Sequence, residues 1–562
     1  MRRPLTDRPI DLLMTNNQHA LLLCGGEINH ANLPIGTNRS NAMVPVNGKP
    51  VIGWILDTLQ ERGFAQVTVV LRVENMRLRD FIEWAYRGRM SVTLAYVDKG
   101  GTILHSLMSG LNQVGEADRL HLILGDTLVR DEDVMLEQDY VYVGPYDVSE
   151  NWCLVQAEPN GGEVTAYYDK ETKVPAGLQA LVGYYHFVDS GLLKNLTAQA
   201  IAEGGRELSA VLKSYGNQRA IVVRPVKDWL DFGHINPFLE AKRKLLQTRF
   251  FNSLSIDSTK GTLTKRSEKN DKLLDELNWY RKLPPSLQVL APRVLEESED
   301  ETGKVCIVQE YYGYPNLAEL YVFGDLDNEI WHTTLHALLE VAKLFQGEQA
   351  PVSAGHVQAM YGDKTWERLN MLREQDAEQW GPLLDAATLT INGVKYPNVL
   401  PQQAAINQRV AALAANVQGG VLHGDYCFSN ILYDVTSQII RVIDPRGSFG
   451  EPGIYGDPRY DLAKLRHSIC GKYDFLIAGL FTTQQEGPTT YRYTIFGNER
   501  SEELGHYFDE ALMSHGASLA EIRFIEALLF ISMVPYHAGH PERQQVMYLQ
   551  GVKFLHESLQ MG

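Results

Sequence analysis

Residues 421–450 read VLHGDYCFSNILYDVTSQIIRVIDPRGSFG, which is an apolar run, a polar loop and two short strands separated by a turn. Asp425 lies on the loop, Asn430 directly precedes the first strand, and Asp444 ends the second. A hairpin of this length brings Asn430 and Asp444 side by side, and such an oxygen pair suits Mg²⁺, a hard cation. Asp425 then lies beside the metal and can take a proton from an attacking hydroxyl. Phosphoryl transfer needs this division of roles, because positioning and charge neutralisation supply most of its catalysis.

The loop HGDYCFSN and the Ile-Asp pair that ends at Asp444 resemble the HGDxxxxN loop and metal Asp of the aminoglycoside phosphotransferase/choline kinase family. The resemblance implies a two-lobed, protein-kinase-like (α+β) phosphotransferase domain in the C-terminal half. It also implies that Asp425 is the catalytic base and that Asn430 and Asp444 hold the metal. Asp461, within GDPRYDLAKL, would brace the catalytic loop. The alternative for these residues is a hairpin with scattered carboxylates.

The composition excludes several classes of protein. A chain of 562 residues is too long for one core, and about three or four compact units are expected. The formal net charge of −17 argues against a general nucleic-acid surface, which needs basic stripes. The five cysteines lack metal-ligand spacing, which favours free thiols in a reducing compartment and no structural zinc site. Mg²⁺ is the one metal that the sequence predicts.

No targeting or membrane segment is evident in the sequence. No apolar run reaches the roughly 18 residues of a membrane helix. The first residues, MRRPLTDRPIDLLMTNNQ, contain no apolar core of a secretory signal. We therefore expect a cytoplasmic protein without nucleic-acid or membrane partners, and homo-oligomerisation stays open.

Strands and helices alternate from His19 onward. Strands are predicted at HALLLC and at residues 66–71, 92–97 and 120–124, and helices at residues 51–62 and 104–114. This alternation predicts an α/β, doubly wound parallel sheet. Ligands of such sheets bind at the carboxyl ends of the strands, where Gly25, Gly26 and Asp126 lie.

The same half of the chain resembles the sugar-phosphate nucleotidyltransferase family over roughly residues 19 to 245. The matching segments, in order, are PVNGKPVI at 45–52, GTILHSLMSGL at 101–111, LILGDTLV at 122–129, the region 164–187, and DWLDFGHI at 228–235. The resemblance implies nucleotide contacts from Gly101 and Thr102, in addition to the glycine pair of the first loop. It also implies metal ligands at Asp126 and Asp231, and Lys170 as the catalytic lysine that neutralises the acceptor phosphate. A solvated surface lysine is the alternative for Lys170.

Two cations of the family pattern are missing. The first loop reads GGEIN without the usual arginine, and Ser40-Asn41 replaces the family's Pro-Lys pair. Triphosphate charge needs compensation by Arg, Lys or Mg²⁺. Arg39 and Lys49 are the candidates to supply it, and a domain that binds nucleotide without catalysis is the alternative. The presence of both Asp126 and Asp231 favours activity.

The C-terminal half opens with a predicted hairpin, residues 251–256 and 262–266, followed by a helix. Lys265 on the second strand and Glu276 on the helix form the pair that holds ATP phosphates in kinase-like folds, with Lys269 as a competitor for Lys265. The strand VCIVQEY, 305–311, matches the position of the hinge that contacts adenine through its backbone in kinase-like folds, which makes Glu310 a candidate nucleotide contact.

Helices are predicted from residues 331–345, 404–417 and 501 to the end, which suits an α-rich large lobe with the acceptor site. Aromatic residues could line that site or belong to the core: Trp366, Trp380, Tyr426, Phe428 and Tyr536.

The expected organisation is a flexible tail (1–18), a nucleotidyltransferase-like domain (19–248), a kinase small lobe with hinge (249–345) and a kinase large lobe (346–562). Together they predict a bifunctional enzyme that phosphorylates a small alcohol (a sugar, polyol or amino-alcohol) with ATP. It then couples the phosphate to an NMP from a second nucleotide: CTP, UTP, GTP or dTTP. The resemblance implies that such products feed capsule or other surface polysaccharides. The alternatives are a stand-alone kinase with a degenerate first domain and a non-catalytic scaffold.

Overall fold

The chain folds into two compact units, Met1–Lys242 and Arg243–Gly562. The computed structural model describes residues 18–26, 40–116, 118–131, 137–159, 162–246, 252–267, 270–299, 304–324, 326–497 and 499–561. The boundary between the units lies in α6 (Ile235–Leu246). Within the described residues, no helix combines the length and apolarity that crossing a membrane requires.

The first unit is built on one large mixed sheet. Its strands are β1 (Gln18–Leu23), β4 (Gln66–Arg72), β5 (Val92–Val97), β6 (Arg119–Leu124), β8 (Tyr140–Gly144), β9 (Cys153–Ala157), β10 (Val164–Asp169), β11 (Gln179–Phe187) and β12 (Val222–Pro225). They run in the order β10-β9-β11-β6-β1-β4-β5, with β8 pairing to β11 and β12. The strands β6, β1, β4 and β5 are mutually parallel, which confirms the doubly wound α/β prediction. The antiparallel β11 extends this sheet beyond what the strand–helix alternation predicts.

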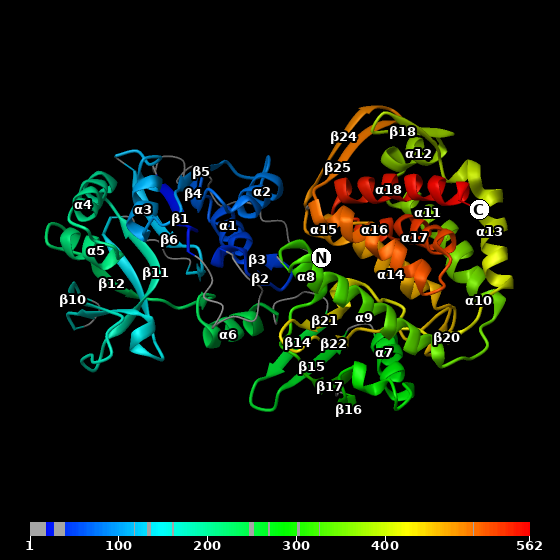
Figure 1. Ribbon diagram of the computed structural model, residues 1–562. Helices are drawn as coiled ribbons and strands as arrows, with labels where there is room; N and C mark the ends of the chain where they lie inside the picture. The colour runs from blue at the N-terminus through cyan, green and yellow to red at the C-terminus, as the bar shows by residue number, and fades with distance from the viewer. Residues whose placement is uncertain are drawn as a thin grey trace. The chain divides into compact units, whose positions relative to one another are not determined.

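Helices cover both faces of this sheet (Figure 1). They are α1 (Val51–Glu61), α2 (Met76–Ala85), α3 (Ile103–Leu111), α4 (Ser190–Ala202) and α5 (Leu208–Gly216). Leu21 and Leu23 of β1 share a core with Leu104 and Leu107 of α3, because alternate strand residues point to the same face. Two small hairpins complete the unit: β2 (Pro45–Val46) with β3 (Lys49–Pro50), and β7 (Thr127–Val129) with β13 (Trp229–Asp231).

The second unit opens with an antiparallel sheet and one helix. The sheet contains β14 (Asn252–Asp257), β15 (Thr262–Ser267), β16 (Val294–Glu299) and β17 (Val305–Glu310), in the order β14-β15-β17-β16. The helix is α7 (Asn270–Lys282). Leu273 and Leu277 of α7 pack on Ile307 of β17, which fixes the helix to the sheet.

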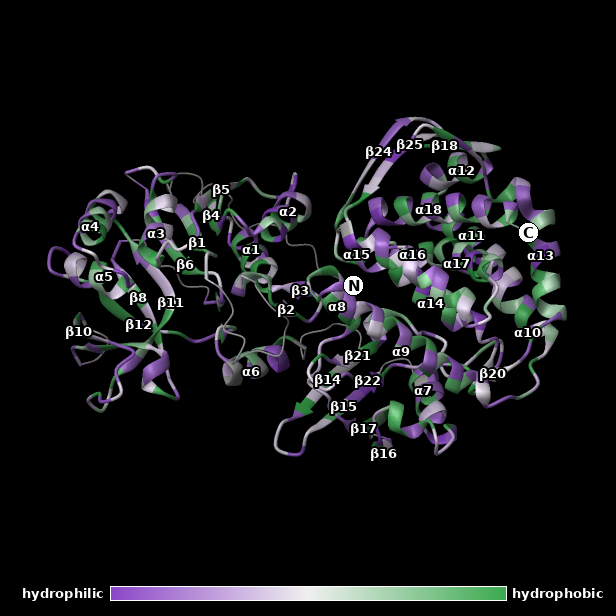
Figure 2. Cartoon of the chain, in the orientation of Figure 1, coloured by the Kyte–Doolittle hydropathy of each residue, from purple (hydrophilic) through white to green (hydrophobic). Residues whose placement is uncertain are grey.

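Helices dominate the rest of this unit (Figure 1). They are α8 (Leu317–Val322), α9 (Asn328–Gly347), α10 (Ala354–Gln358), α11 (Lys364–Gln375), α12 (Ala377–Asp385), α13 (Gln403–Ala415), α14 (Arg459–Ile469), α15 (Tyr473–Ile477), α16 (Glu499–Ser514), α17 (Leu519–Met533) and α18 (Pro541–Gln560). The helix expected from residue 501 to the end is three helices, because Gly516 (φ 82°) follows the first and proline residues follow the second. Many helices alternate between hydrophobic and hydrophilic stretches (Figure 2), as amphipathic helices do.

Two groups of strands lie among these helices. The pairs β21 (Ile431–Asp434) with β22 (Ile439–Val442), and β20 (Gly420–Val421) with β23 (Tyr455–Gly456), surround the catalytic loop expected from the sequence. A separate sheet, in the order β19-β18-β25-β24, was not predicted. It contains β18 (Thr388–Ile391), β19 (Val394–Pro397), β24 (Phe481–Gly487) and β25 (Thr490–Ile495).

Candidate active sites

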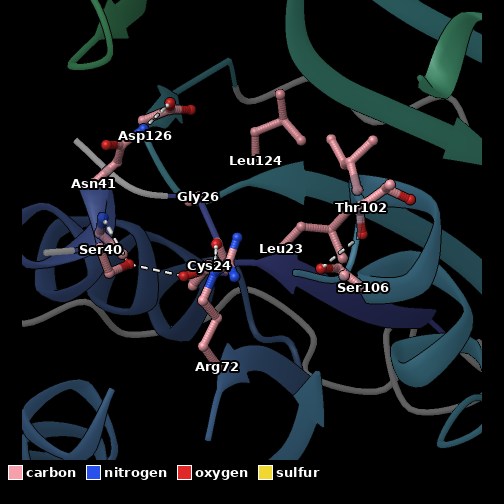
Figure 3. Close-up of a pocket in the computed structure, with 15 residues that line it drawn as sticks. Leu23, Cys24, Gly26, Ser40, Asn41, Arg72, Thr102, Ser106, Leu124 and Asp126 are labelled. Carbon is pink, nitrogen blue, oxygen red and sulfur yellow. Dashed lines mark hydrogen bonds between the residues drawn. The ribbon is translucent and has the colours of Figure 1, made fainter. Parts of the chain in front are cut away.

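A cavity of about 180 Å³ lies at the carboxyl ends of β1 and β6 in the first unit. Its lining includes Gly25, Gly26, Gly101, Thr102 and Asp126. Figure 3 labels Gly26, Thr102 and Asp126 among them. Four of the predicted nucleotide-binding residues and the first predicted metal ligand therefore lie around one cavity. This is the edge of the sheet at which α/β proteins bind their ligands.

Asp231 converges on Asp126 although the two residues are far apart in the sequence. The antiparallel pairing of β13 with β7 places Asp231 opposite Thr127. A Cβ atom built on Gly233 would lie 2.8 Å from Oδ2 of Asp126 and 3.5 Å from Oδ1 of Asp231. Burial, and then the charge of Asp231, raise the pKa of the Asp126 carboxyl. A divalent cation would relieve this repulsion, so the carboxylate pair fits Mg²⁺.

Polar neighbours hold both carboxylates in place. The Nδ2 atom of Asn41 donates a hydrogen bond to Asp126 Oδ2 at 3.0 Å. The Nδ1 atom of His234 lies 2.8 Å from Asp231 Oδ2, and this hydrogen bond raises the pKa of His234. The sequence analysis missed both supporting roles. Asn41 stands where the family pattern has a lysine, so the substitution exchanges a cation for a group that orients Asp126.

Arg72 brings a cation to the cavity that the sequence analysis did not identify. It is the last residue of β4, and its Nε atom donates to the main-chain oxygen of Gly25 at 2.7 Å (Figure 3). It lines the cavity together with the glycine loop. The rule that ligands bind at the carboxyl ends of parallel strands could have indicated this residue, because β4 is the neighbour of β1.

The other proposed cations lie elsewhere. Lys49 pairs with Asp57, its Nζ atom lies 5.0 Å from the centre of the Trp54 ring, and it is not among the lining residues of the cavity. Lys170 has a positive φ of 55°, and its Nζ atom lies 4.0 Å from Glu207 on the exposed surface. The structure therefore does not bring Lys49 or Lys170 to the cavity. Arg39 falls outside the described residues.

In the second unit, the hairpin of β21 and β22 brings the predicted metal ligands together. Ile431 pairs with Val442, and the amide of Ile443 donates to the main-chain oxygen of Asn430 at 2.9 Å. Asn430 therefore lies across the hairpin from the residue that precedes Asp444. Its Nδ2 atom donates to the main-chain oxygen of Asp425 at 3.0 Å. Its Oδ1 atom accepts a long hydrogen bond of 3.4 Å from Ser429 Oγ and keeps a second lone pair for a metal. A carboxylate and an amide oxygen form a donor set that fits Mg²⁺.

Lys265 joins this site from the antiparallel sheet. Its Nζ atom lies 2.6 Å from Oε1 of Glu276 on α7 and also pairs with Asp444. Burial opposes the charge of Lys265, but Asp444 and Glu276 outweigh it and raise the lysine pKa well above its usual value. A strand, the helix that follows it and a hairpin far along the chain thus contribute to one charged group. Lys269, the competing candidate, falls outside the described residues.

Asp425 lies at the exposed side of the site, with 35 % of its side chain accessible to solvent. Lys464 Nζ lies 3.0 Å and Arg446 Nη2 lies 3.6 Å from its Oδ1 atom. Burial acts to raise the pKa of Asp425, but the two cations outweigh it and hold that pKa far below the usual range. Asp425 is therefore a carboxylate at neutral pH and can accept a proton.

Asp461 braces the catalytic loop, as the sequence predicts. Its carboxylate accepts hydrogen bonds from the amides of His423, at 2.7 Å, and Gly424, at 2.9 Å. Gly424 has a φ of 80°, and a Cβ atom there would lie 2.7 Å from the Cβ atom of Arg446. Glycine therefore permits both the turn and the close approach of Arg446.

The remaining candidate residues are the hinge residue Glu310 and the aromatic residues proposed for the acceptor site. Glu310 ends β17, where its carboxylate accepts hydrogen bonds from Arg293 and Tyr312 and its amide donates to the main-chain oxygen of Arg293. Three of the aromatic candidates are at most 1 % exposed and belong to the core: Trp380, Tyr426 and Phe428. Trp366 is half-buried and donates to Asn407, and Tyr536 is exposed.

Comparison with protein families assigns both halves of the chain. The model of the phosphotransferase enzyme family matches residues 201–493, and the model of nucleotidyl transferases matches residues 19–248. Because the first match spans more than half of the chain, the protein belongs to the phosphotransferase enzyme family, and it carries a nucleotidyltransferase domain before the kinase-like domain. The two matches overlap at residues 201–248, most of which lie in the first unit.

The solved structures that resemble part of this chain include a thymidylyltransferase and UDP-glucose pyrophosphorylases. A Bacillus anthracis protein assigned as a glucose-1-phosphate thymidylyltransferase, in complex with sucrose, is 20 % identical, with a TM-score of 0.37; the match covers 42 % of this chain and 97 % of that chain. A UDP-glucose pyrophosphorylase in complex with UDP-glucose is 17 % identical, with a TM-score of 0.35, covering 41 % and 99 %. The UDP-glucose pyrophosphorylase of Acinetobacter baumannii is 16 % identical, with a TM-score of 0.35, covering 41 % and 93 %. No curated protein matches the chain.

Proposed function

We propose that this protein is a bifunctional enzyme that makes a nucleotide-activated building block in two steps. The C-terminal unit phosphorylates a small alcohol with ATP, and the N-terminal unit couples the resulting phosphate ester to an NMP. The observation that supports this most directly is that each unit offers a pair of oxygen-bearing side chains that fits Mg²⁺. In the first unit the carboxylates of Asp126 and Asp231 converge from distant segments, and in the second the amide of Asn430 and the carboxylate of Asp444 lie at one end of the β21–β22 hairpin.

In the kinase step, Asp425 accepts the proton of the acceptor hydroxyl, whose oxygen attacks the γ-phosphorus of ATP. Lys265, fixed by Glu276, holds the ATP phosphates, and ADP leaves. Mg²⁺, when held by Asn430 and Asp444, neutralises charge on the phosphates.

In the transferase step, an oxygen of the phosphate ester attacks the α-phosphorus of the second nucleotide, and pyrophosphate leaves. Arg72 contributes positive charge at the cavity, where the family's loop arginine and lysine are missing. Mg²⁺, when held by Asp126 and Asp231, stabilises the charge that develops at the α-phosphate. The second nucleotide is CTP, UTP, GTP or dTTP. The reaction takes place in the cytoplasm, and its product is a precursor for surface polysaccharide.

A panel assay tests the two activities separately. The purified full chain is incubated with ATP, Mg²⁺, each of the four other nucleotides and a panel of alcohols, and both ADP and pyrophosphate are measured. We expect Asp425→Asn to abolish ADP formation, and Asp126→Asn to abolish pyrophosphate formation without affecting ADP. Added phosphate ester should restore pyrophosphate formation in Asp425→Asn.

A stand-alone kinase with a degenerate first domain is the second candidate, and the replacement of the two family cations favours it. It predicts ADP without pyrophosphate for every nucleotide, and no effect of Asp126→Asn on any activity. Full ATP turnover by Asp425→Asn would instead exclude both candidates.

A further inference from the structure

Four cations gather at the catalytic carboxylate Asp425 and its neighbours: two contact Asp425 directly, and two lie on α11 near Arg446 and Tyr460. Arg446 and Lys464 contact Asp425 directly. Lys364 and Arg368 lie four residues apart on α11 and therefore share one face of that helix. A wide π-helical turn, Ala359–Asp363, immediately precedes Lys364, and such turns often occur at functional sites.

Tyr460 on α14 connects these cations. Arg446 Nη1 donates to the Tyr460 hydroxyl at 2.9 Å, and Lys364 Nζ lies 5.8 Å from the centre of the Tyr460 ring. Burial acts to raise the pKa of Tyr460, but Arg446, Lys364 and Lys464 outweigh it and lower that pKa to about 8. Three cations therefore act on the Tyr460 hydroxyl, and their combined effect exceeds that of burial and Asp425.

The carboxylates near this cluster do not balance it. Asp425 pairs with Arg446 and Lys464, and Asp461 is occupied by two main-chain amides. Glu367 is exposed and adjoins Arg368 on the same helix. Among the described residues, no carboxylate forms an ion pair with Lys364.

Arg368 likewise has side-chain donors without hydrogen-bond partners among the described residues. Its Nε and Nη1 atoms are buried and have no hydrogen-bond partner within the described part of the chain. Its guanidinium stacks on the Tyr536 ring, with 4.1 Å between the guanidinium carbon and the ring centre. A buried guanidinium donor without a partner costs free energy, so a small rotation of Arg368 that brings these N–H groups to an anionic ligand would be favourable.

We propose that the acceptor alcohol of the kinase step carries a negative charge, a carboxylate or a phosphate, which Lys364 and Arg368 bind beside Asp425. This inference rests on the proposed kinase function. The acceptor hydroxyl oxygen forms a bond to the γ-phosphorus, the bond from that phosphorus to the β,γ-bridging oxygen breaks, and ADP leaves with the electron pair. The hydroxyl proton passes to Asp425. A cationic amino-alcohol would be repelled by the same four side chains.

Matched pairs of acceptors test the charge requirement. ADP release is measured with glycerol against glycerate, glycerol against glycerol 3-phosphate, and sorbitol against gluconate, with choline and ethanolamine as cations. We expect acceleration by anionic members alone. Lys364→Met and Arg368→Met should raise the KM of the active anion roughly tenfold or more and leave the KM of ATP unchanged. The matched control is Lys395→Met, which replaces an exposed lysine of β19.

A binding measurement keeps the test independent of turnover. Tyrosinate absorbance is titrated with and without gluconate, glycerate or glycerol 3-phosphate, and Tyr460→Phe identifies the signal of Tyr460. A bound anion should raise the pKa of Tyr460 in the wild type and not in Lys364→Met.

Acceleration by neutral or cationic alcohols, or no response of Tyr460 to any anion, would overturn the proposal. A raised KM of ATP with an unchanged KM of the acceptor would assign these cations to the nucleotide instead. Failure of the kinase function itself would appear differently, as no ADP with any acceptor and no stabilisation of the protein by ATP.

Discussion

Arg72 brings positive charge to the cavity of the first unit. Because it is the cation that β4 contributes to the cavity, Arg72→Met should raise the KM of the second nucleotide about tenfold in the pyrophosphate assay. Arg72→Lys should restore part of the affinity. Lys49→Met serves as the control, since Lys49 pairs with Asp57 away from the cavity lining. A larger effect of Lys49→Met than of Arg72→Met would support the role that the sequence assigns to Lys49.

Asp474 on α15 makes stability depend on pH. Burial raises its pKa to about 7, above the usual value of 3.8, so between these values the folded state binds the proton more tightly than the unfolded state. Stability contributed by the protonated carboxyl is therefore present at low pH and is lost as pH rises to 7, by about 1.4 kcal/mol per unit. Asp474→Asn should remove this component, as urea unfolding at pH 5, 6, 7 and 8 would show. Equal pH slopes for both proteins would contradict it.

At the residue scale, the motifs predicted the second site better than the first. Lys265, Glu276 and Asp444 meet, and Asn430 lies across the hairpin from Ile443. A strand, a helix and a hairpin have fixed geometries that the sequence pattern reveals. The cluster around Tyr460 could not be predicted, since α11 and α14 approach each other only through long-range packing.

The helices α14, α16 and α17 are joined by a buried charge network. Arg466 pairs with Glu526 and lies 2.8 Å from Asp509, which also pairs with Arg523 at 2.9 Å. Arg466→Met leaves two carboxylates buried without their main partner. We expect it to lower the free energy of unfolding by about 3–5 kcal/mol, measured by urea denaturation.

The control for this network is an exposed pair on the neighbouring hairpin. Arg492 and Glu486 lie 3.0 Å apart with most of the arginine side chain in solvent. Arg492→Met should leave the unfolding midpoint unchanged, because exposed pairs contribute little. A similar loss of unfolding free energy in Arg466→Met and Arg492→Met would show that the buried network stabilises the protein no more than an exposed ion pair does.

At the scale of elements, the sequence predicted the strands that are long apolar runs and missed those that are short or half-exposed. The parallel strands of the first unit are continuous apolar runs and were located to within a few residues. The sheet of β18, β19, β24 and β25 was missed because its strands are short or half-exposed, and β18 pairs with β25 across about a hundred residues.

The whole molecule should unfold in two steps, because each unit has its own core. A non-hydrolysable ATP analogue at 100 times its Kd should stabilise the transition of the second unit by about 2.7 kcal/mol. Lys265→Met should weaken that response, and the transition of the first unit should not move. Calorimetry checks both points, and a single transition that shifts as a whole would refute the independence of the units.

The ion pair between Lys265 and Asp444 gives the C-terminal unit an internal counterion. A metal ion that takes Asp444 removes one of the two carboxylate partners of the buried Lys265 ammonium and leaves Glu276 as the other. This loss is costly unless another anion takes the place of Asp444. The phosphate oxygens of a nucleotide are such anions. We therefore expect a metal ion and a nucleotide to bind this unit together more strongly than either binds alone. The pairing of Lys265 with Asp444 thus favours binding of the metal–nucleotide complex over binding of the free metal ion or the free nucleotide.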